Sequence, residues 1–374
     1  VRDLLLGQAP KDIDISTAAT PDQVESVFEH THRIGACFGV ITVVHGDCCY
    51  EVASFREERE YLDGRHPELI NYTLDPKLDV VRRDFTINGL LLDPETWTVI
   101  DHVGGIEDLR LGVLRCIGEP AVRFAEDYLR ILRAVRFCVR FRMEMDSETA
   151  KAILPLAPKL KELSAERIRD ELSKMLEGPL PSRSFRLMLE LGILSEIFPE
   201  LVRLDKLPQP KKYHPEGDAF IHTMLMLDHI SIPDARIGWA VLLHDIGKPQ
   251  TFSQDEDGVE HFYGHESLGA DLTETILERF KMPREFTSSV AEAVRNHMKF
   301  AHVHLMRPAK WRRMLASNNF PLELELHRLD CISSHAKLEN YVLLLDRVAA
   351  LSHARALPKP LLNGADLIKL GNKP

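Results

Sequence analysis

Two acidic residues near the amino end have a spacing that suits metal-assisted phosphoryl chemistry. Residues 12–16 read Asp-Ile-Asp-Ile-Ser. Alternate side chains of an extended strand share one face, so the pattern predicts that Asp12 and Asp14 point the same way while Ile13 and Ile15 enter the core. Two carboxylates placed in this way can clamp divalent cations that also grip a nucleotide's phosphates and align an attacking hydroxyl. Taken alone, the motif is also typical of exposed turns and helix caps.

A hairpin downstream offers a third carboxylate. Residues 39–44 and 50–55 are rich in β-branched and aromatic side chains and flank a turn-like segment at 45–49, which predicts a β-hairpin. If the hairpin lies beside the strand with the two aspartates, Glu51 presents its carboxylate to the same cations; the alternative is an exposed strand charge. The charged segment 56–67 lacks a clean period, and we expect a mobile loop there.

A polar cluster enters an apolar run at residues 81–91, where we expect a helix. Arg82 and Arg83 could reach phosphates, and Asp84 and Asn88, one helical turn apart, could hold a ribose. The alternative is a capped helix with a surface ion pair. Further along, Asp101 followed by Gly104 and Gly105 predicts a turn and then the start of a helix.

A second pair of side chains could read a nucleobase. The helical pattern of 124–137 places Asp127, Arg130 and Arg133 on one stripe. Cytosine and adenine both offer an amine donor beside a ring-nitrogen acceptor, whereas uracil and guanine offer a ring N–H beside a carbonyl. A carboxylate and a guanidinium, such as Asp127 and Arg130, would therefore accept C and A and reject U and G. The alternative is an intrahelical salt bridge of about 0.2–0.5 kcal/mol.

Together these stretches resemble the class II tRNA nucleotidyltransferase and bacterial poly(A) polymerase family, part of the DNA polymerase β-like superfamily. The matching elements are 1–7 with 11–15, 50–56, 82–88, Asp101 with Gly104, Gly105 and Asp108, 126–130, and 136–137. The family pattern also has a Gly-Gly pair just before Val1, which this sequence lacks.

The resemblance implies a role for each matching residue. Asp12 and Asp14 would bind Mg²⁺, with Glu51 as the third carboxylate. The residues implied to bind the nucleotide are Arg2, Asp3, Arg82, Arg83, Asp84, Asn88, Asp127, Arg130, Arg133 and Arg136. Asp127 and Arg130 would select CTP and then ATP. The tRNA 3′-hydroxyl would attack the α-phosphorus in line and expel pyrophosphate. Full CCA addition, addition of A alone, and poly(A) synthesis share these motifs; the length of 56–67 favours A addition.

The second half carries histidines and aspartates in an order that suits a metal centre. Imidazole and carboxylate together suit Mn, Fe, Ni or Mg, and a site with open positions can activate water for phosphoester hydrolysis. The order resembles the HD phosphohydrolase superfamily: His222, His244, Asp245 and Asp330 match its four-residue signature, and His265 and His297 match the extra ligands of two-metal members. This implies bound Mn²⁺, Ni²⁺ or Fe²⁺ and a phosphodiesterase, nucleotidase or phosphatase reaction.

The length, charge and cysteine content of the chain exclude several classes of protein. With 374 residues the chain should hold two or three domains, and its net charge of −10 argues against a general nucleic-acid coat or a membrane-surface role. The six cysteines are scattered without metal-ligand spacing, which indicates reduced thiols in a cytoplasm. We find neither a membrane-spanning apolar run nor a signal-peptide pattern. The chain begins with Val1, and 361–374 resemble the start of a further family segment, so we expect that both ends are trimmed.

We therefore predict an α+β protein with a DNA polymerase β-like nucleotidyltransferase head of mixed or antiparallel sheet at 1–116. A helical neck at 117–206, a mostly α-helical HD domain at 207–350 and the start of a C-terminal segment at 351–374 would follow. The predicted activity is addition of CCA to tRNA 3′ ends from CTP and ATP without a nucleic-acid template. The hypotheses from other classes are an RNA-binding or regulatory protein with an inactive head, and a chain whose main activity is the HD hydrolase.

Overall fold

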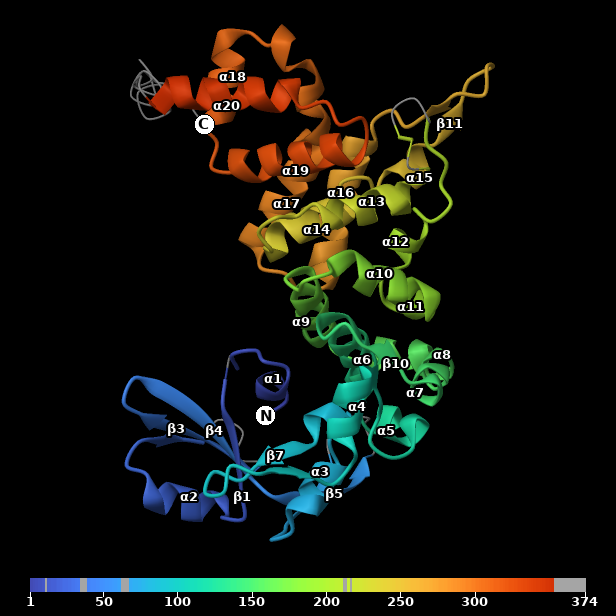
Figure 1. Ribbon diagram of the computed structural model, residues 1–374. Helices are drawn as coiled ribbons and strands as arrows, with labels where there is room; N and C mark the ends of the chain where they lie inside the picture. Colours follow the sequence, from blue (N-terminus) through green and yellow to red (C-terminus); the bar gives the residue numbers. More distant parts are fainter. Residues whose placement is uncertain (11, 34–38, 62–66, 211–213, 216, 353–374) are drawn as a thin grey trace, which may run out of the picture. The chain divides into compact units, whose positions relative to one another are not determined.

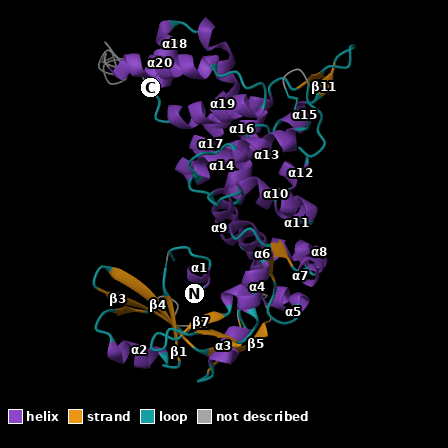
Figure 2. Cartoon of the chain, viewed as in Figure 1, coloured by secondary structure: helices purple, strands orange, loops and turns teal. Residues whose placement is uncertain are grey.

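The computed structural model describes residues 1–10, 12–33, 39–61, 67–210, 214–215 and 217–352. The chain divides into two compact units, Val1–Pro199 and Glu200–Pro374. Strands lie mostly in the first unit, whereas the second unit is built almost entirely of helices (Figures 1 and 2). The predicted α+β class is therefore confirmed. In the described part of the chain, no helix has both the length and the apolar character needed to cross a membrane.

A mixed four-stranded sheet carries Asp14 and Glu51. Its strands, in spatial order, are β1 (Asp14–Thr17), β4 (Cys48–Ser54), β3 (Val40–His45) and β2 (Thr31–His32). β3 and β4 form the predicted antiparallel hairpin, and β1 runs parallel to β4 at the edge of the sheet (Figure 1). This order places the strand with the first acidic motif next to the strand with Glu51.

Helix α2 (Pro21–Val27) covers one face of this sheet and begins at a capping box. The Thr20 hydroxyl accepts a hydrogen bond from the Gln23 amide, and the Gln23 side chain accepts one from the Thr20 amide. The small core behind the helix consists of Val24, Ile41, Val43 and Val52. The prediction that Ile13 and Ile15 enter the core is wrong, because they are 61% and 42% exposed. Ile13 precedes β1, and β1 is an edge strand that is paired on one side only.

Two further predictions about local structure are wrong. Residues 56–61 form β5 (Arg56–Tyr61), which pairs with β6 (Pro67–Tyr72), and not a mobile loop; residues 62–66 lie outside the described residues. The apolar run after Asn88 is β7 (Leu90–Leu92), paired with β8 (Val99–Asp101), and not a helix. In both cases backbone pairing with a distant segment decides the structure, and a short apolar or charged run does not reveal such pairing.

Several short elements complete the first unit. They are α1 (Arg2–Leu5), α3 (Pro76–Val81), the 3₁₀ turn η2 (Thr86–Asn88), α4 (Gly105–Leu111), β9 (Val113–Leu114), α5 (Pro120–Glu126), α6 (Leu129–Arg140), β10 (Glu144–Met145), α7 (Ser147–Lys151), α8 (Ile153–Leu156), η3 (Ala157–Glu162), α9 (Ala165–Leu176), α10 (Pro181–Glu190) and α11 (Ile193–Ile197). The predicted turn before α4 is present: Gly104 has φ +81°, and the Asp101 carboxylate accepts hydrogen bonds from four successive amides, 103–106. Helix α6 packs against α9 and α10.

The second unit consists mainly of helices around an apolar centre. Beyond α12 (Pro199–Val202), the elements are α13 (Ala219–Asp228), α14 (Ala235–Leu243), α15 (Lys248–Thr251), a hairpin of β11 (Ser253–Gln254) and β12 (Glu260–His261), α16 (His265–Arg279), α17 (Arg284–Asn296), η4 (His297–Leu305), α18 (Pro308–Leu315), α19 (Phe320–Ser333) and α20 (Glu339–Ser352). Helices α13, α14, α17 and α19 pack against one another and carry or flank the predicted metal ligands. The segment 361–374 lies outside the described residues.

Candidate active sites

Asp14 and Glu51, two of the three predicted carboxylates, lie on the neighbouring strands β1 and β4. Asp14 lies directly opposite Glu51 in the parallel register of these strands. Loss of solvent around its carboxyl group raises the pKa of Asp14, and the negative charge of Asp12 raises it further. A set of carboxylate oxygens is the donor chemistry that Mg²⁺ prefers. Among the described residues, however, sets of three donor atoms within 4.8 Å of one another occur only in the second unit, so these three carboxylates are less tightly gathered.

A buried aspartate that the sequence analysis missed holds both arginines of the polar cluster. Asp79 is 2% exposed, and its two carboxylate oxygens lie 2.6 Å from Arg82 Nη2 and 2.9 Å from Arg83 Nη2. Arg83 Nη2 also donates to the Ser16 hydroxyl on β1, at 3.1 Å. Arg83 therefore contacts β1 directly, and Asp79 connects Arg82 to Arg83. The available signal was the spacing, because Asp79 lies on α3 and precedes the two arginines, which directly follow that helix, by three and four residues.

Asp84 is buried and fully engaged within the protein. It accepts hydrogen bonds from Arg133 Nε and Asn88 Nδ2 and from the Phe85 amide, each at 2.8 Å. Burial raises the pKa of Asp84, but the Arg133 guanidinium and these donors outweigh burial and lower the pKa overall. The predicted proximity of Asp84 and Asn88 is present, although a 3₁₀ turn creates it and not an α-helix.

Arg2 and Asp3 connect α1 to the end of α6. Arg2 donates to the Asn88 side chain and pairs with Asp3 at 2.8 Å. Its guanidinium carbon lies 4.3 Å from the ring centroid of Phe141. Asp3 in turn lies 3.5 Å from Arg140 Nη2. Both residues therefore have a structural role in the described chain, whatever they contribute to nucleotide binding.

Asp127 does not share a helical stripe with Arg130 and Arg133, contrary to the prediction. Helix α5 ends at Glu126, Asp127 has extended torsions (φ −152°, ψ 103°), and α6 begins at Leu129. The Asp127 carboxylate accepts a hydrogen bond from the Leu129 amide at 3.0 Å. An aspartate that bonds the backbone two residues ahead competes with helix continuation, which explains the break.

The intrahelical salt bridge between Asp127 and Arg130 is also not formed. Asp127 instead pairs with Arg167 of α9, whose Nη2 lies 2.8 and 3.0 Å from the two carboxylate oxygens. Arg130 Nη1 pairs with Glu126 Oε2 at 2.6 Å and donates to the Arg123 carbonyl at 2.9 Å. The sequence analysis did not find Arg167, because it lies 40 residues away in the chain.

The last arginine implied to bind the nucleotide turns toward α9. Arg136 Nε lies 2.6 Å from Glu171 Oε2, and its guanidinium carbon lies 4.2 Å from the ring centroid of Phe137. Glu171 is buried, so this ion pair links α6 to α9 within the unit. Arg136 is thus held by contacts with α6 and α9.

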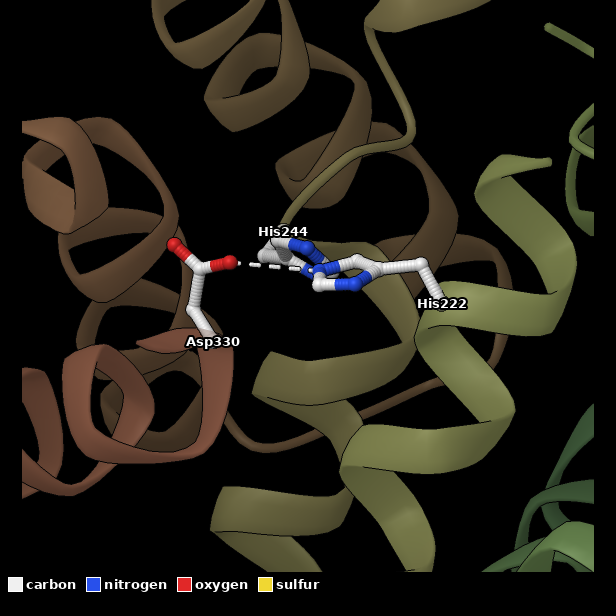
Figure 3. Close-up of side chains that lie close together, drawn as sticks. All are labelled: His222, His244 and Asp330. Atoms are coloured by element: carbon white, nitrogen blue, oxygen red, sulfur yellow. Dashed lines mark ion pairs between the residues drawn. The ribbon is translucent and has the colours of Figure 1, made fainter. Parts of the chain in front are cut away.

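In the second unit all six residues of the predicted metal centre come together. They form two sets of three whose donor atoms lie within 4.8 Å of one another: His222, His244 and Asp330, and Asp245, His265 and His297. His222 of α13 and Asp330 of α19 point toward each other, with His222 Nε2 lying 3.2 Å from Asp330 Oδ1 (Figure 3). The arrangement brings five separate segments to one place, which no local sequence pattern could establish.

Three of these imidazoles have their orientation fixed by the backbone. The Nδ1 atoms of His244, His265 and His297 each lie 2.6–2.8 Å from the carbonyl oxygen three residues earlier. If each Nδ1–H donates to that carbonyl, the Nε2 lone pair is left to bind a cation, as is usual for metal-binding histidines. His265 Nε2 and His297 Nε2 are 3.1 Å apart. Two lone pairs at that distance repel, and a shared cation with bonds of about 2.0–2.1 Å resolves the repulsion.

Asp245 belongs to the second set and also approaches the first. Its Oδ2 is 3.1 Å from His244 Nε2, and its Oδ1 is 3.5 Å from His265 Nε2. His244 Nε2 is buried and makes no hydrogen bond of good geometry. Burial raises the pKa of Asp245, but His244 and Lys248 outweigh it and hold that pKa well below its usual value. Burial and then the charge of His265 lower the pKa of His297 to about 3, so His297 is neutral and able to bind a metal at pH 7. The donor set thus fits one or two divalent transition-metal ions.

The glycine of the His-Asp-Ile-Gly-Lys segment permits this geometry. A Cβ atom at Gly247 would lie 2.3 Å from the His265 carbonyl oxygen and 2.8 Å from the Gly269 amide nitrogen. Glycine therefore allows the start of α16 to approach the His244–Asp245 segment closely enough to add His265 to the site.

Comparisons with known families agree with this architecture. Three family models match successive parts of the chain: "Poly A polymerase head domain" at 1–115, "Probable RNA and SrmB- binding site of polymerase A" at 142–204, and "HD domain" at 213–332. Fold and site together define a nucleotidyltransferase head followed by an HD domain.

Similar proteins of known function show which family within this class the chain resembles. The chain is 34% identical to the multifunctional CCA protein of Aromatoleum aromaticum over 363 residues, 95% of this chain and 83% of that protein. It is 32% identical to the multifunctional CCA protein of Nitrosococcus oceani over 351 residues, which are 92% of this chain and 81% of that protein. The CCA-adding enzyme of Geobacillus thermodenitrificans is 41% identical over 193 residues, 52% of this chain and 48% of that enzyme, so the match spans about half its length.

A solved structure shows the same fold. The CCA-adding enzyme of Bacillus stearothermophilus in complex with CTP aligns with a TM-score of 0.72 and 27% identity, covering 100% of this chain and 82% of that one. The chain belongs to the family of CCA-adding enzymes and multifunctional CCA proteins.

Proposed function

We propose that this protein adds CCA to the 3′ end of tRNA, using CTP and ATP without a nucleic-acid template. The observation that carries the proposal is the junction of β1 and β4. There Asp14 faces Glu51, Asp12 adds its charge, and Arg83 reaches Ser16 of the same strand. Carboxylates for cations and arginines for phosphates therefore belong to one small region. The family membership and the CTP-bound relative favour the same reaction.

In the proposed reaction, Asp12, Asp14 and Glu51 hold Mg²⁺, which supplies charge neutralisation at the triphosphate. Arg82 and Arg83, oriented by Asp79, donate to the phosphates. The oxygen of the tRNA 3′-hydroxyl forms a bond to the α-phosphorus and passes its proton to solvent water. The bond from that phosphorus to the β-phosphate oxygen breaks, and pyrophosphate leaves with the bonding electrons.

Base selection is proposed for Asp127 and Arg130. Asp127 Oδ1 accepts hydrogen bonds from both the Leu129 amide and Arg167, whereas Oδ2 accepts one from Arg167 only and keeps a second lone pair for a base amine. Arg130 has further N–H donors besides those that bond Glu126 and the backbone. The pair can thus offer an acceptor and a donor to C or A while the protein contacts stay in place. The proposed nucleotide set also includes Arg2, Asp3, Asp84, Asn88, Arg133 and Arg136.

A gel assay tests the proposal. Transcripts of tRNA ending before CCA, after the first C and after CC are incubated with protein, Mg²⁺ and CTP, ATP or both. We expect the shortest transcript to gain CCA and stop. Gain of one A by the CC-ended transcript alone would indicate an A-adding specialist. Long A tails would indicate a poly(A) polymerase. Absence of any extension would contradict the proposal and favour a chain whose main activity is the HD hydrolase.

The geometry of the second unit supports a second activity, phosphoester hydrolysis. The supporting observation is the 3.1 Å approach of His265 Nε2 to His297 Nε2 beside the His244–Asp245 pair. We propose that Mn²⁺, Ni²⁺ or Fe²⁺ binds there, where it would generate a nucleophilic water. The test has two parts. Mass spectrometry measures the bound metal, and a separate assay measures hydrolysis of 2′,3′-cyclic nucleotides and of a 3′-phosphorylated tRNA. Bound metal without hydrolysis would leave a structural metal site and refute the hydrolase.

The cysteines accord with a reducing compartment. All five cysteines of the described chain (Cys48, Cys49, Cys116, Cys138 and Cys331) are free thiols. Because free thiols are typical of a reducing compartment, we propose a cytoplasmic location.

A further inference from the structure

An arginine occupies a backbone position that favours glycine at the end of α6. Arg142 has φ +55°, and it follows the last residues of the helix in a Schellman arrangement. The Met143 amide donates to the Cys138 carbonyl at 2.8 Å, and the Arg142 amide donates to the Val139 carbonyl at 3.1 Å. Glycine is the usual residue in this left-handed position because any Cβ is strained there. The chain keeps a strained arginine where a glycine would fit better.

The side chain of Arg142 faces a cavity and has no partner within the described part of the chain. Among the described residues, none forms an ion pair or a side-chain hydrogen bond with Arg142, and the residue is exposed. The cavity has a volume of about 710 Å³ and lies within the first unit. It is lined by Leu6, Gln8, Arg136, Val139, Arg140, Phe141, Arg142, Lys174, Met175, Glu177, Gly178, Pro179, Leu180 and Ser184.

The other three cations of this cavity already face carboxylates. Arg136 and Lys174 lie 2.6 and 3.4 Å from oxygens of Glu171, and Arg140 lies 3.5 Å from Asp3. The cavity also contains one lining carboxylate, Glu177. Arg142 is thus the lining cation whose charge is not offset by an ion pair in the described structure, which favours an anionic ligand at its guanidinium.

We propose that this cavity binds the phosphate backbone of the tRNA strand and that Arg142 makes the phosphate contact. The inference rests on the proposed function in taking tRNA as the ligand. Several cations lie beside apolar surface from Leu6, Met175 and Leu180, which suits a phosphodiester with its sugar. In the proposed reaction Arg82 and Arg83 contact the triphosphate, and neither lines this cavity. Of the other residues proposed to bind the nucleotide only Arg136 lines it, and its guanidinium pairs with Glu171. The functional contact of the Arg142 side chain offsets its backbone strain.

The substitution Arg142→Gly removes the proposed phosphate contact of the side chain and at the same time relieves the strain of the backbone at this position. Glycine relieves the left-handed strain, so the melting temperature should stay equal or rise. The Kd for tRNA, measured by fluorescence anisotropy without nucleotide, should rise about tenfold, as expected for one lost charged hydrogen bond. The slope of log affinity against log salt should fall by about one. Arg142→Lys should retain part of the affinity.

The matched control is Lys281→Gly. Lys281 has φ +56° in the same arrangement after α16, with the Met282 amide donating to the Leu277 carbonyl at 2.9 Å. The control removes one positive charge and the same kind of strain, and it should leave tRNA affinity unchanged.

Three outcomes would overturn the inference: an unchanged tRNA affinity in Arg142→Gly, an equal loss of affinity in Lys281→Gly, or an increase in the KM for CTP in place of the tRNA effect. The last would mean that the cavity holds the nucleotide. Binding is measured without catalysis, so a wild-type chain that binds tRNA through Arg142 but never extends it would refute the proposed function alone.

Discussion

At the scale of single residues, the carboxylate of Asp127 is held from two directions. The Leu129 amide donates to one oxygen, and Arg167 bridges both. A side chain that discriminates between bases must keep its orientation, because a shift of about 1 Å can cost a hundredfold in rate. Arg167 is therefore a positioning residue for the proposed base-reading pair.

We predict that Arg167→Ala lowers kcat/KM for CTP and ATP about tenfold to a hundredfold and raises misincorporation of U. Arg167→Lys should restore part of the rate. The measurement is single-nucleotide extension with each of the four triphosphates. Arg169→Ala on the same helix, where Arg169 pairs with neighbouring Asp170, is the control. An Arg167→Ala protein that keeps wild-type discrimination between C and U would show that Asp127 needs no such support.

At the scale of elements, the metal centre depends on how closely α16 approaches the end of α14. His265 is the first residue of α16, and His244 and Asp245 directly follow α14. Gly247 sets their separation, since a side chain there would overlap the backbone of α16. The ligands belong to elements that a single methyl group could push apart.

We predict that Gly247→Ala weakens metal binding and lowers the free energy of unfolding of the second unit by about 1–3 kcal/mol, as expected for overpacking. Metal content and chemical denaturation measure the two effects. Gly269→Ala on α16 is the control, because its Cβ would meet Val294 at an ordinary 3.4 Å and alanine favours a helix. Wild-type metal content in Gly247→Ala would contradict this account.

At the scale of the whole molecule, the two candidate sites belong to different compact units. The carboxylates and arginines lie in Val1–Pro199, and the histidines lie in Glu200–Pro374. Described side chains of one site are thus not needed to build the other, and the two reactions should be separable by substitution.

We predict that Asp12→Ala abolishes tRNA extension, by a factor of about a hundred or more, and leaves hydrolysis unchanged. His244→Ala should do the reverse and also reduce bound transition metal. Both assays are run on both variants and on wild type, with circular dichroism to verify folding. Loss of both activities in either folded variant would refute the model of two independent centres.

Local features of the fold were predictable from the sequence because short-range forces decide them. The hairpin around Gly46, the Thr20 cap and the turn at Gly104 follow from turn and capping preferences of neighbouring residues. Residues 56–61 and 90–92 were assigned wrongly, since their strands exist only through pairing with partners elsewhere in the chain. Ile15 is exposed because β1 lies at the edge of the sheet, and the neighbours of β1 likewise depend on pairing with distant segments.

The sequence by itself determined the residue types that define the family and the kinds of chemistry they allow. The tertiary structure alone decided which of them meet. It gathered six ligands from five segments, paired Asp127 with Arg167 and Arg130 with Glu126, and left Arg142 facing a cavity. The physical reason is that charge, hydrogen bonding and metal binding act over a few ångströms, and long-range packing sets those distances.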